Sequence, residues 1–219
     1  GNLEDRWILS RLNATITTVE ASINAFHFSD AASALYGFFW TDLCDWYLEI
    51  AKGRIRAGDS AVQSMLLHCL ETALKLLHPV MPFITEELWS KLPQRQSMLV
   101  TAPWPVADAR AADPAAETQI AAIQAITSAI RDIQNSYPGA KGKSVVLSPR
   151  DERTRAAIEQ SRLVIESLTG APIGENAVGA AKPAAAAARV LPDVQVFIGG
   201  VIDKGAEVAK LTQLRDTLP

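Results

Sequence analysis

The chain has 219 residues, of which 48% are hydrophobic, so it is long and apolar enough to form one large or two small domains with a real core. Residues 1–105 contain eight Lys and Arg against eleven Asp and Glu, and residues 106–219 contain thirteen of each kind. Neither half is a wide basic surface for duplex phosphates, so any contact with nucleic acid must be local.

The sequence shows no features of an exported or membrane-inserted protein. Its N-terminus, GNLEDRW, lacks the basic and apolar regions of a signal peptide, and its apolar runs are shorter than the roughly 20 residues that cross a bilayer. We therefore expect a soluble, cytoplasmic protein without a membrane partner. Cys44 and Cys69 lie in helical apolar stripes, which predicts buried free thiols rather than a disulfide or metal site.

Apolar spacing predicts a first helix over residues 3–25 and a long second helix from Ser29 to about Arg56. Ser29 and Asp30 supply an N-cap and a first-turn anion for the second helix. At a period of 3.6 residues this helix has two apolar faces, so it must be covered on two sides. One face holds Ala32, Leu35, Phe39, Leu43, Trp46 and Ile50; the other holds Tyr36, Trp40, Cys44 and Tyr47; and a polar row of Asp42, Asp45, Glu49, Lys52 and Arg56 is left for water.

Two further helices are predicted over residues 60–78 and 82–92. Pro79 and Pro82 separate them, and Pro82 suits the first turn of the second one because proline fixes φ and lacks an N–H. Four helices joined by short turns predict an antiparallel helix bundle over residues 1–105.

A small α/β subdomain is predicted over residues 106–202, after a loop rich in Pro, Ala and Asp. Asp113 and Pro114 begin a helix that runs to about Ser136, a strand covers 143–147, and a helix covers 150–168. One or two more strands are expected within 171–198, the clearer one at 194–198, and their order is left open. Residues 203–219 predict the truncated start of a C-terminal helical arm.

Patterns that carry chemistry are scarce. No phosphate-loop or nucleophile-elbow motif occurs, and the three histidines are not spaced as metal ligands, so we predict neither a catalytic residue nor a metal site. The loop of residues 139–143, GAKGK, follows a helix and precedes a strand, which is the reverse of a phosphate loop. Either a solvated loop or a contact with a phosphate backbone fits it.

Two groups combine cations with flat side chains, as sites for single-stranded nucleic acid do. One lies near the junction of the first two helices and the other at the end of the second helix, and for both a plain surface role remains open. With the two lysines of the GAKGK loop, the candidate RNA-binding residues are Arg6, Arg11, Phe26, His27, Lys52, Arg54, Arg56, Lys141 and Lys143.

Four blocks of sequence, in order, indicate a family. They are DRWILSRL at 5–12, FHFSDAA at 26–32, FW followed by CDWYLE and AK within 39–52, and LLHPVMPFITEELW at 76–89. They resemble the anticodon-binding domain of class I aminoacyl-tRNA synthetases, and within that class they are most similar to the valyl enzymes. Residues 130–138 and 194–211 resemble the small α/β segment and the start of the coiled-coil arm of the same enzymes.

The resemblance implies a mainly α-helical protein that binds the anticodon stem-loop of a tRNA. A separate catalytic domain would activate valine with ATP; its His-x-Gly-His and Lys-Met-Ser-Lys-Ser motifs are absent here, so no cofactor and no ligase activity are expected of this chain by itself. The implied partners are tRNA and that catalytic domain, with the chain a monomer. The alternatives are the anticodon-binding domain of an isoleucyl, leucyl or methionyl enzyme, and a helical protein-interaction module without an RNA role.

Overall fold

The computed structural model describes residues 1–93 and 97–202. These residues are mostly helical, with one small four-stranded sheet. The backbone divides into two compact units between Ile120 and Ala121. No helix of the described ranges is both long and apolar enough to span a bilayer. The C-terminal arm predicted for residues 203–219 lies outside the described residues.

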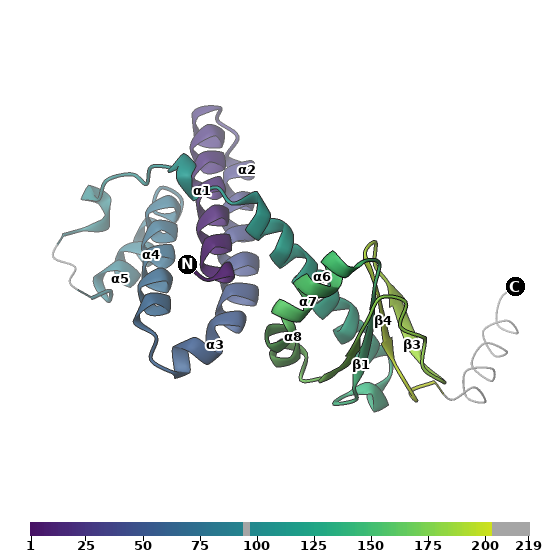
Figure 1. Ribbon diagram of the computed structural model, residues 1–219. Helices are drawn as coiled ribbons and strands as arrows, with labels where there is room; N and C mark the ends of the chain where they lie inside the picture. The colour runs from purple at the N-terminus through teal and green to yellow at the C-terminus, as the bar shows by residue number, and fades with distance from the viewer. Residues whose placement is uncertain (94–96, 203–219) are drawn as a thin grey trace, which may run out of the picture. The chain divides into compact units, whose positions relative to one another are not determined.

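Helix α1 (Leu3–Asn24) packs against a second helical rod that runs from Phe28 to Arg56 (Figure 1). The rod consists of α2 (Phe28–Tyr36), a π-helical segment (Gly37–Tyr47) and α3 (Leu48–Arg56). Both helices lie where the apolar spacing predicts them, to within one residue at each end. The π-helical segment was not predicted.

The π-helical segment changes which side chains of the rod are buried. A π turn closes its hydrogen bond one residue later than an α turn, so a stripe assigned at a 3.6-residue period drifts out of phase. Asp42, predicted to face water, is 9% exposed, whereas Tyr36 and Trp40, predicted to be covered, are 66% and 54% exposed. The predicted faces were wrong at these positions. The buried residues of the rod are Ala31, Leu35, Phe38, Asp42, Leu43, Tyr47 and Ala51.

Helices α4 (Ser60–Leu77) and α5 (Pro82–Ser90) follow, close to their predicted positions. Asp59 caps α4 by accepting a hydrogen bond from the Ala61 N–H at 2.9 Å, and Pro82 occupies the first turn of α5. Their apolar sides meet in a cluster of Leu74, Trp89 and Leu99. Of the two cysteines, Cys69 is buried, and burial raises the pKa of its thiol to about 12, whereas Cys44 is half-buried.

The first unit extends beyond residue 105, where the sequence places the boundary. The start of α6 (Pro114–Ser136) is bound to α1 by side chains. Arg6 forms an ion pair of 3.2 Å with the helix-capping Asp113, and the Ser10 hydroxyl donates a hydrogen bond to Glu117. These contacts hold the first turns of α6 against α1. The division between the two units therefore falls inside α6.

The second unit contains a mixed sheet in the order β2-β1-β4-β3. Strand β1 (Val145–Pro149) pairs in parallel with β2 (Ile173–Asn176) and antiparallel with β4 (Val194–Ile198), which also pairs with β3 (Ala187–Val190). The strands near 143–147 and at 194–198 are therefore confirmed. The region 171–198 contains three strands rather than one or two, because β3 begins in the alanine-rich run, whose composition gives no strand pattern.

The helix predicted over 150–168 is two helices, α7 (Glu152–Gln160) and α8 (Arg162–Thr169). The backbone leaves the α region at Ser161, whose N–H bonds to the carbonyl of Ile158, three residues back, in place of the α-helical partner. Gly170, with φ of 63°, ends α8 in a left-handed conformation that favours glycine, as its position predicted.

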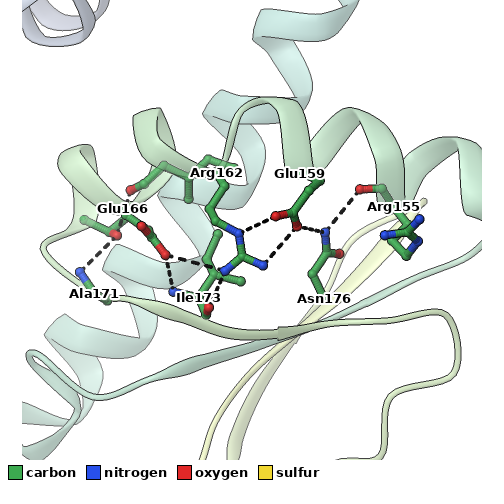
Figure 2. Close-up of polar contacts among 9 residues, drawn as sticks. Arg155, Glu159, Arg162, Glu166, Ala171, Ile173 and Asn176 are labelled. Atoms are coloured by element: carbon green, nitrogen blue, oxygen red, sulfur yellow. Dashed lines mark hydrogen bonds and ion pairs between the residues drawn. The ribbon is translucent and has the colours of Figure 1, made fainter.

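Side chains of α7 and α8 bind the free edge of β2 (Figure 2). The Ile173 N–H donates to Glu166 at 2.7 Å, and the Ile173 carbonyl accepts from Arg162. Arg162 also holds Glu159 with two hydrogen bonds of 2.7 and 2.9 Å, and Asn176 donates to Glu159 at 3.1 Å. Edge-strand backbone groups that would otherwise face solvent are thus paired, which protects this edge from other strands.

This network predicts a specific pH dependence. Hydrogen bonds from Arg162 and then Asn176 lower the pKa of Glu159 from 4.5 to about 2. The folded protein therefore binds fewer protons at this carboxyl than the unfolded chain, so the stabilisation is present above pH 4.5 and is lost as the pH falls to about 2. Carboxyl-carbon NMR titration should give this low pKa, and Arg162→Met should return it towards 4.5. A Glu159 pKa that does not respond to Arg162→Met would contradict the assignment.

Candidate nucleic-acid interface

The turn between α1 and α2 exposes two aromatic rings. Phe26 has a φ of 60°, in the left-handed region that side-chain-bearing residues rarely adopt, and is 79% exposed. Its ring meets Phe28 edge to face, with centroids 6.2 Å apart. His27 is also exposed and lies 3.7 Å from Asp30. The predicted pair of Phe26 and His27 is thus brought together at a strained, solvent-facing tip, a kind of feature that concentrates at functional sites.

A second pair of rings lies farther along the rod and was not among the predicted site residues. Tyr36 and Trp40 are stacked, with centroids 6.4 Å apart and planes inclined by 15°. Their spacing of four residues places them one turn apart on the helix surface. More than half of each side chain is open to solvent, so the pair forms a flat apolar platform.

A groove of about 400 Å³ lies between α1 and the rod. Tyr36 and Trp40 directly precede Gly37 and Thr41, which line the groove. Hydroxyl groups from both helices face it, and each can donate and accept a hydrogen bond. The lining residues are Arg11, Ala14, Thr15, Thr18, Ser33, Ala34, Gly37, Phe38, Thr41 and Asp42.

Arg11, which lines the groove, is paired with two carboxylates. Arg11 donates to Asp42 at 2.8 Å and lies 3.6 Å from Glu117. Burial raises the pKa of Asp42, although the hydrogen bond from Arg11 acts in the opposite direction. Burial alone would lower the pKa of Arg11, but its hydrogen bond to Asp42 and the two nearby carboxylates raise it. A paired cation beside hydroxyl groups suits neutral base edges better than phosphates.

Arg54, another predicted cation, is surrounded by carboxylates. It donates to Asp59 at 2.8 Å and to Glu4 and Asp5 at 2.9 Å, and its side chain is 21% exposed. These hydrogen bonds, first of all the one to Asp5, raise its pKa. Tyr47, which is buried, donates to the same Asp5 at 2.7 Å. Arg54 therefore joins the start of α1, the end of α3 and the cap of α4.

The remaining predicted cations lie apart from one another. Lys52 pairs with Glu49 at 2.6 Å on the surface of α3. Arg56 is exposed, without an ion pair to another described residue. Arg6 is half-exposed beside its partner Asp113. Lys141 and Lys143 belong to the second unit, in the loop before β1. The structure thus gathers the aromatic candidates near α1 and α2 but distributes the cations.

A separate apolar surface surrounds the start of α5. Phe83 is 90% exposed, and a groove of about 390 Å³ beside it is lined by Met98 and Val100 among others. Glu86 lines this groove while accepting the Leu99 N–H at 2.8 Å. The exposed large apolar residues here are Val80, Met81, Phe83, Ile84, Leu88, Met98 and Val100. An apolar surface with carboxylates suits a protein partner rather than phosphates.

No three His, Cys, Asp or Glu side chains of the described ranges come close enough together to hold a metal ion.

Comparison with known proteins supports the family resemblance. Residues 5–147 match the family described as "Anticodon-binding domain of tRNA ligase". The valine–tRNA ligase of Carboxydothermus hydrogenoformans is 34% identical over 223 residues, covering 99% of this chain and 24% of that protein. The ligase of Lactiplantibacillus plantarum is 34% identical (95% of this chain, 24% of the relative), and that of Thermotoga maritima is 31% identical (98% and 25%). The chain spans about a quarter of the length of these relatives.

Among solved structures, the LeuRS of Agrobacterium radiobacter K84, in its ternary complex LeuRS-tRNA-LeuAMS, is 30% identical with a TM-score of 0.41. The similarity covers 52% of this chain and 13% of that one. A TM-score this low supports no argument about the fold, so the assignment depends on the sequence family.

Proposed function

Since this chain belongs to the family of anticodon-binding domains of tRNA ligases and is homologous to valine–tRNA ligases, we propose that its helical unit binds the anticodon stem-loop of a valine tRNA. The anticodon bases would lie on the Tyr36–Trp40 platform and in the groove between α1 and the rod.

The exposed platform is the observation that carries this assignment. Proteins recognise unpaired loop bases by stacking them on aromatic rings and by hydrogen bonding to their edges. Tyr36 and Trp40 supply the flat faces, and Thr18, Ser33 and Thr41 supply hydroxyl groups in the adjoining groove. Phe26 and Phe28 extend the aromatic surface at the tip, where His27 adds a polar ring.

Cations elsewhere on the helical unit would hold phosphates of the same RNA. Arg56 is the most available, because it is exposed and its charge is not matched by a carboxylate of the described chain. Lys52 and Arg6 can exchange a surface ion pair for a phosphate at little cost, since exposed ion pairs contribute only about 0–1 kcal/mol. Arg11 and Arg54 would act indirectly, by fixing the helices that form the surface.

The catalytic step would belong to another part of the ligase. That part would bind ATP and valine, while this chain would bind no cofactor and contribute no catalytic residue. The apolar surface around Phe83 supports a contact with it, because large apolar side chains that are exposed here would become covered there. We further propose that the ligase acts as a monomer in the cytoplasm.

We also propose that the helical unit has the helix arrangement of this family. Helices α1 to α5 would form the antiparallel bundle typical of these domains, supported by the contacts of α1 with α2 and α4 and of α4 with α5.

The isolated anticodon stem-loop of a valine tRNA tests the proposal, because it contains the anticodon but lacks the rest of the tRNA. The chain is expected to bind a fluorescently labelled stem-loop, and unlabelled whole tRNA should displace it. If the stem-loop neither binds nor competes with whole tRNA, the helical unit does not hold the anticodon arm.

A further inference from the structure

Every lysine in the described part of the second unit lies at one end of its sheet. These residues are Lys141, Lys143 and Lys182, and all three are exposed. The first two precede β1, and Lys182 precedes β3. Strand register pairs Val145 with Ile198 and Ile198 with Ala187, so the start of β1, the end of β4 and the start of β3 are at the same level.

The turn that follows β4 brings these lysines together. Lys143 donates to the Gly200 carbonyl at 2.6 Å, and the Gly200 N–H donates to the Ala184 carbonyl at 3.1 Å. Pro183, the neighbour of Lys182, lies 3.0 Å from the position that a Cβ of residue 199 would take. Lys143 and the segment after Lys182 therefore both contact Gly200, and Lys141 lies two residues before Lys143 in the sequence.

The charges of these lysines are not matched by carboxylates of the described residues. None of the three forms an ion pair with a carboxylate of the described residues, since the Lys143 ammonium bonds to a neutral carbonyl. Some arginines of the same unit are paired with carboxylates: Arg150 pairs with Asp193 at 2.8 Å, and Arg162 pairs with Glu159 at 2.7 Å. The surface is locally basic although the chain as a whole is slightly acidic, with a net charge of −3.

The residues around the lysines are small, so the rigid backbone of a ligand can come close to this surface. Gly139, Ala140 and Gly142 alternate with Lys141 and Lys143, and Lys182 follows two alanines. Lysine ammonium groups act as point charges on phosphates and read no base sequence. Such a surface fits the sugar–phosphate backbone of an RNA stem better than it fits an unpaired loop.

We infer that Lys141, Lys143 and Lys182 form a phosphate-binding surface for the backbone of an RNA stem. It is a second contact with the same tRNA, distinct from the base-reading surface of the helical unit. The inference rests on the proposed function and deepens it: the helical unit supplies the choice of anticodon, and this surface supplies affinity that is independent of sequence.

The dependence of tRNA binding on salt tests this inference. Each phosphate contact contributes roughly 0.7–0.9 to the slope of log K against log salt concentration. The variant Lys143→Gln/Lys182→Gln should lower that slope by about 1.5 and weaken binding at low salt by about tenfold. Glutamine keeps a donor for the Gly200 carbonyl, and circular dichroism with thermal unfolding verifies that the fold is retained.

A control with the same loss of charge is Lys75→Gln/Lys91→Gln in the helical unit. Lys91 pairs with Glu87 at 3.0 Å, and Lys75 lies 5.8 Å from the centroid of the Trp89 ring, so this variant should leave the slope nearly unchanged. Equal slopes for both variants and the unmodified chain would overturn the inference. So would a loss of anticodon preference in Lys143→Gln/Lys182→Gln, because phosphate contacts cannot distinguish bases.

The two proposals fail in different ways. If the chain binds tRNA without any anticodon preference and the lysine variant still lowers the slope, the anticodon assignment is wrong and the phosphate-binding surface stands. If the chain prefers the native anticodon and the lysine variant leaves the slope unchanged, the anticodon assignment stands and the phosphate-binding surface is wrong. A chain that binds no RNA at low salt contradicts both.

Discussion

Replacing Tyr36 and Trp40 together with alanine is expected to weaken binding of a valine tRNA by about tenfold to a hundredfold. One base stacked on an aromatic side chain contributes roughly 1–3 kcal/mol, and the pair offers at least one such face. Both side chains are more than half exposed, so the substitution removes little buried surface and should change the free energy of unfolding by less than about 1 kcal/mol. Fluorescence anisotropy and urea unfolding measure the two quantities.

Phe83→Ala is the matched control, because it also removes an exposed aromatic ring from the helical unit. Phe83 is 90% exposed on α5, on the surface that we assign to a protein contact, and its removal should leave tRNA affinity within about twofold. If Phe83→Ala weakened binding as much as the double variant, or if the double variant bound as tightly as the unmodified chain, the platform would not hold the bases.

Arg54→Met is expected to give the largest loss of stability, about 3 kcal/mol in the free energy of unfolding. Removing one partner of a buried ion pair leaves the other uncompensated, which costs roughly 3–5 kcal/mol when the pair is fully buried. Here three carboxylates lose their shared cation, but the side chain is 21% exposed, so solvent lowers the cost. Urea unfolding followed by circular dichroism measures the change.

Lys52→Met provides the comparison on the same helix. Its ion pair with Glu49 at 2.6 Å is exposed, so the loss should be below about 0.5 kcal/mol. Similar losses for the two variants would show that Arg54 is a surface cation, free to bind RNA as its sequence position suggested. A large loss confined to Arg54→Met would show that it acts by holding α1, α3 and α4 together.

Local signals in the sequence locate most of the helices. Asp59 before α4, Pro82 in α5 and Asp113 with Pro114 before α6 act over one turn each, so they can be recognised without the rest of the fold. Strand β3 could not be recognised in this way. It begins in a run of alanines and is held by its pairing with β4, a contact that no local pattern contains.

The prediction of which faces of the rod are buried was wrong for a different physical reason. A helical stripe is meaningful only while the turn length is constant, and the π-helical segment lengthens the turn at Gly37. Within this segment Trp40 is exposed, and Asp42 is buried against Arg11. The spacing of four residues between two aromatic rings was visible in the sequence, but their exposure depends on the tertiary packing of α1.

The charge pattern alone did not show which of the predicted RNA-binding cations are available at the surface. Arg54 and Arg56 look alike in sequence, yet one contacts three carboxylates and the other faces solvent. Two of those carboxylates, Glu4 and Asp5, are about fifty residues away along the chain, so only the folded structure brings them to Arg54. The family resemblance was more informative than charge patterns, because ordered blocks of sequence identify a common ancestor without requiring any of these contacts.

The most direct test of the account compares two transcripts of a valine tRNA that differ only in the anticodon. If the helical unit reads the edges of the anticodon bases by hydrogen bonds, the chain should bind the native transcript at least about tenfold more tightly than the one with an exchanged anticodon, since one donor or acceptor left unsatisfied costs roughly 1–3 kcal/mol. Equal affinities for the two transcripts at the same salt concentration would contradict it.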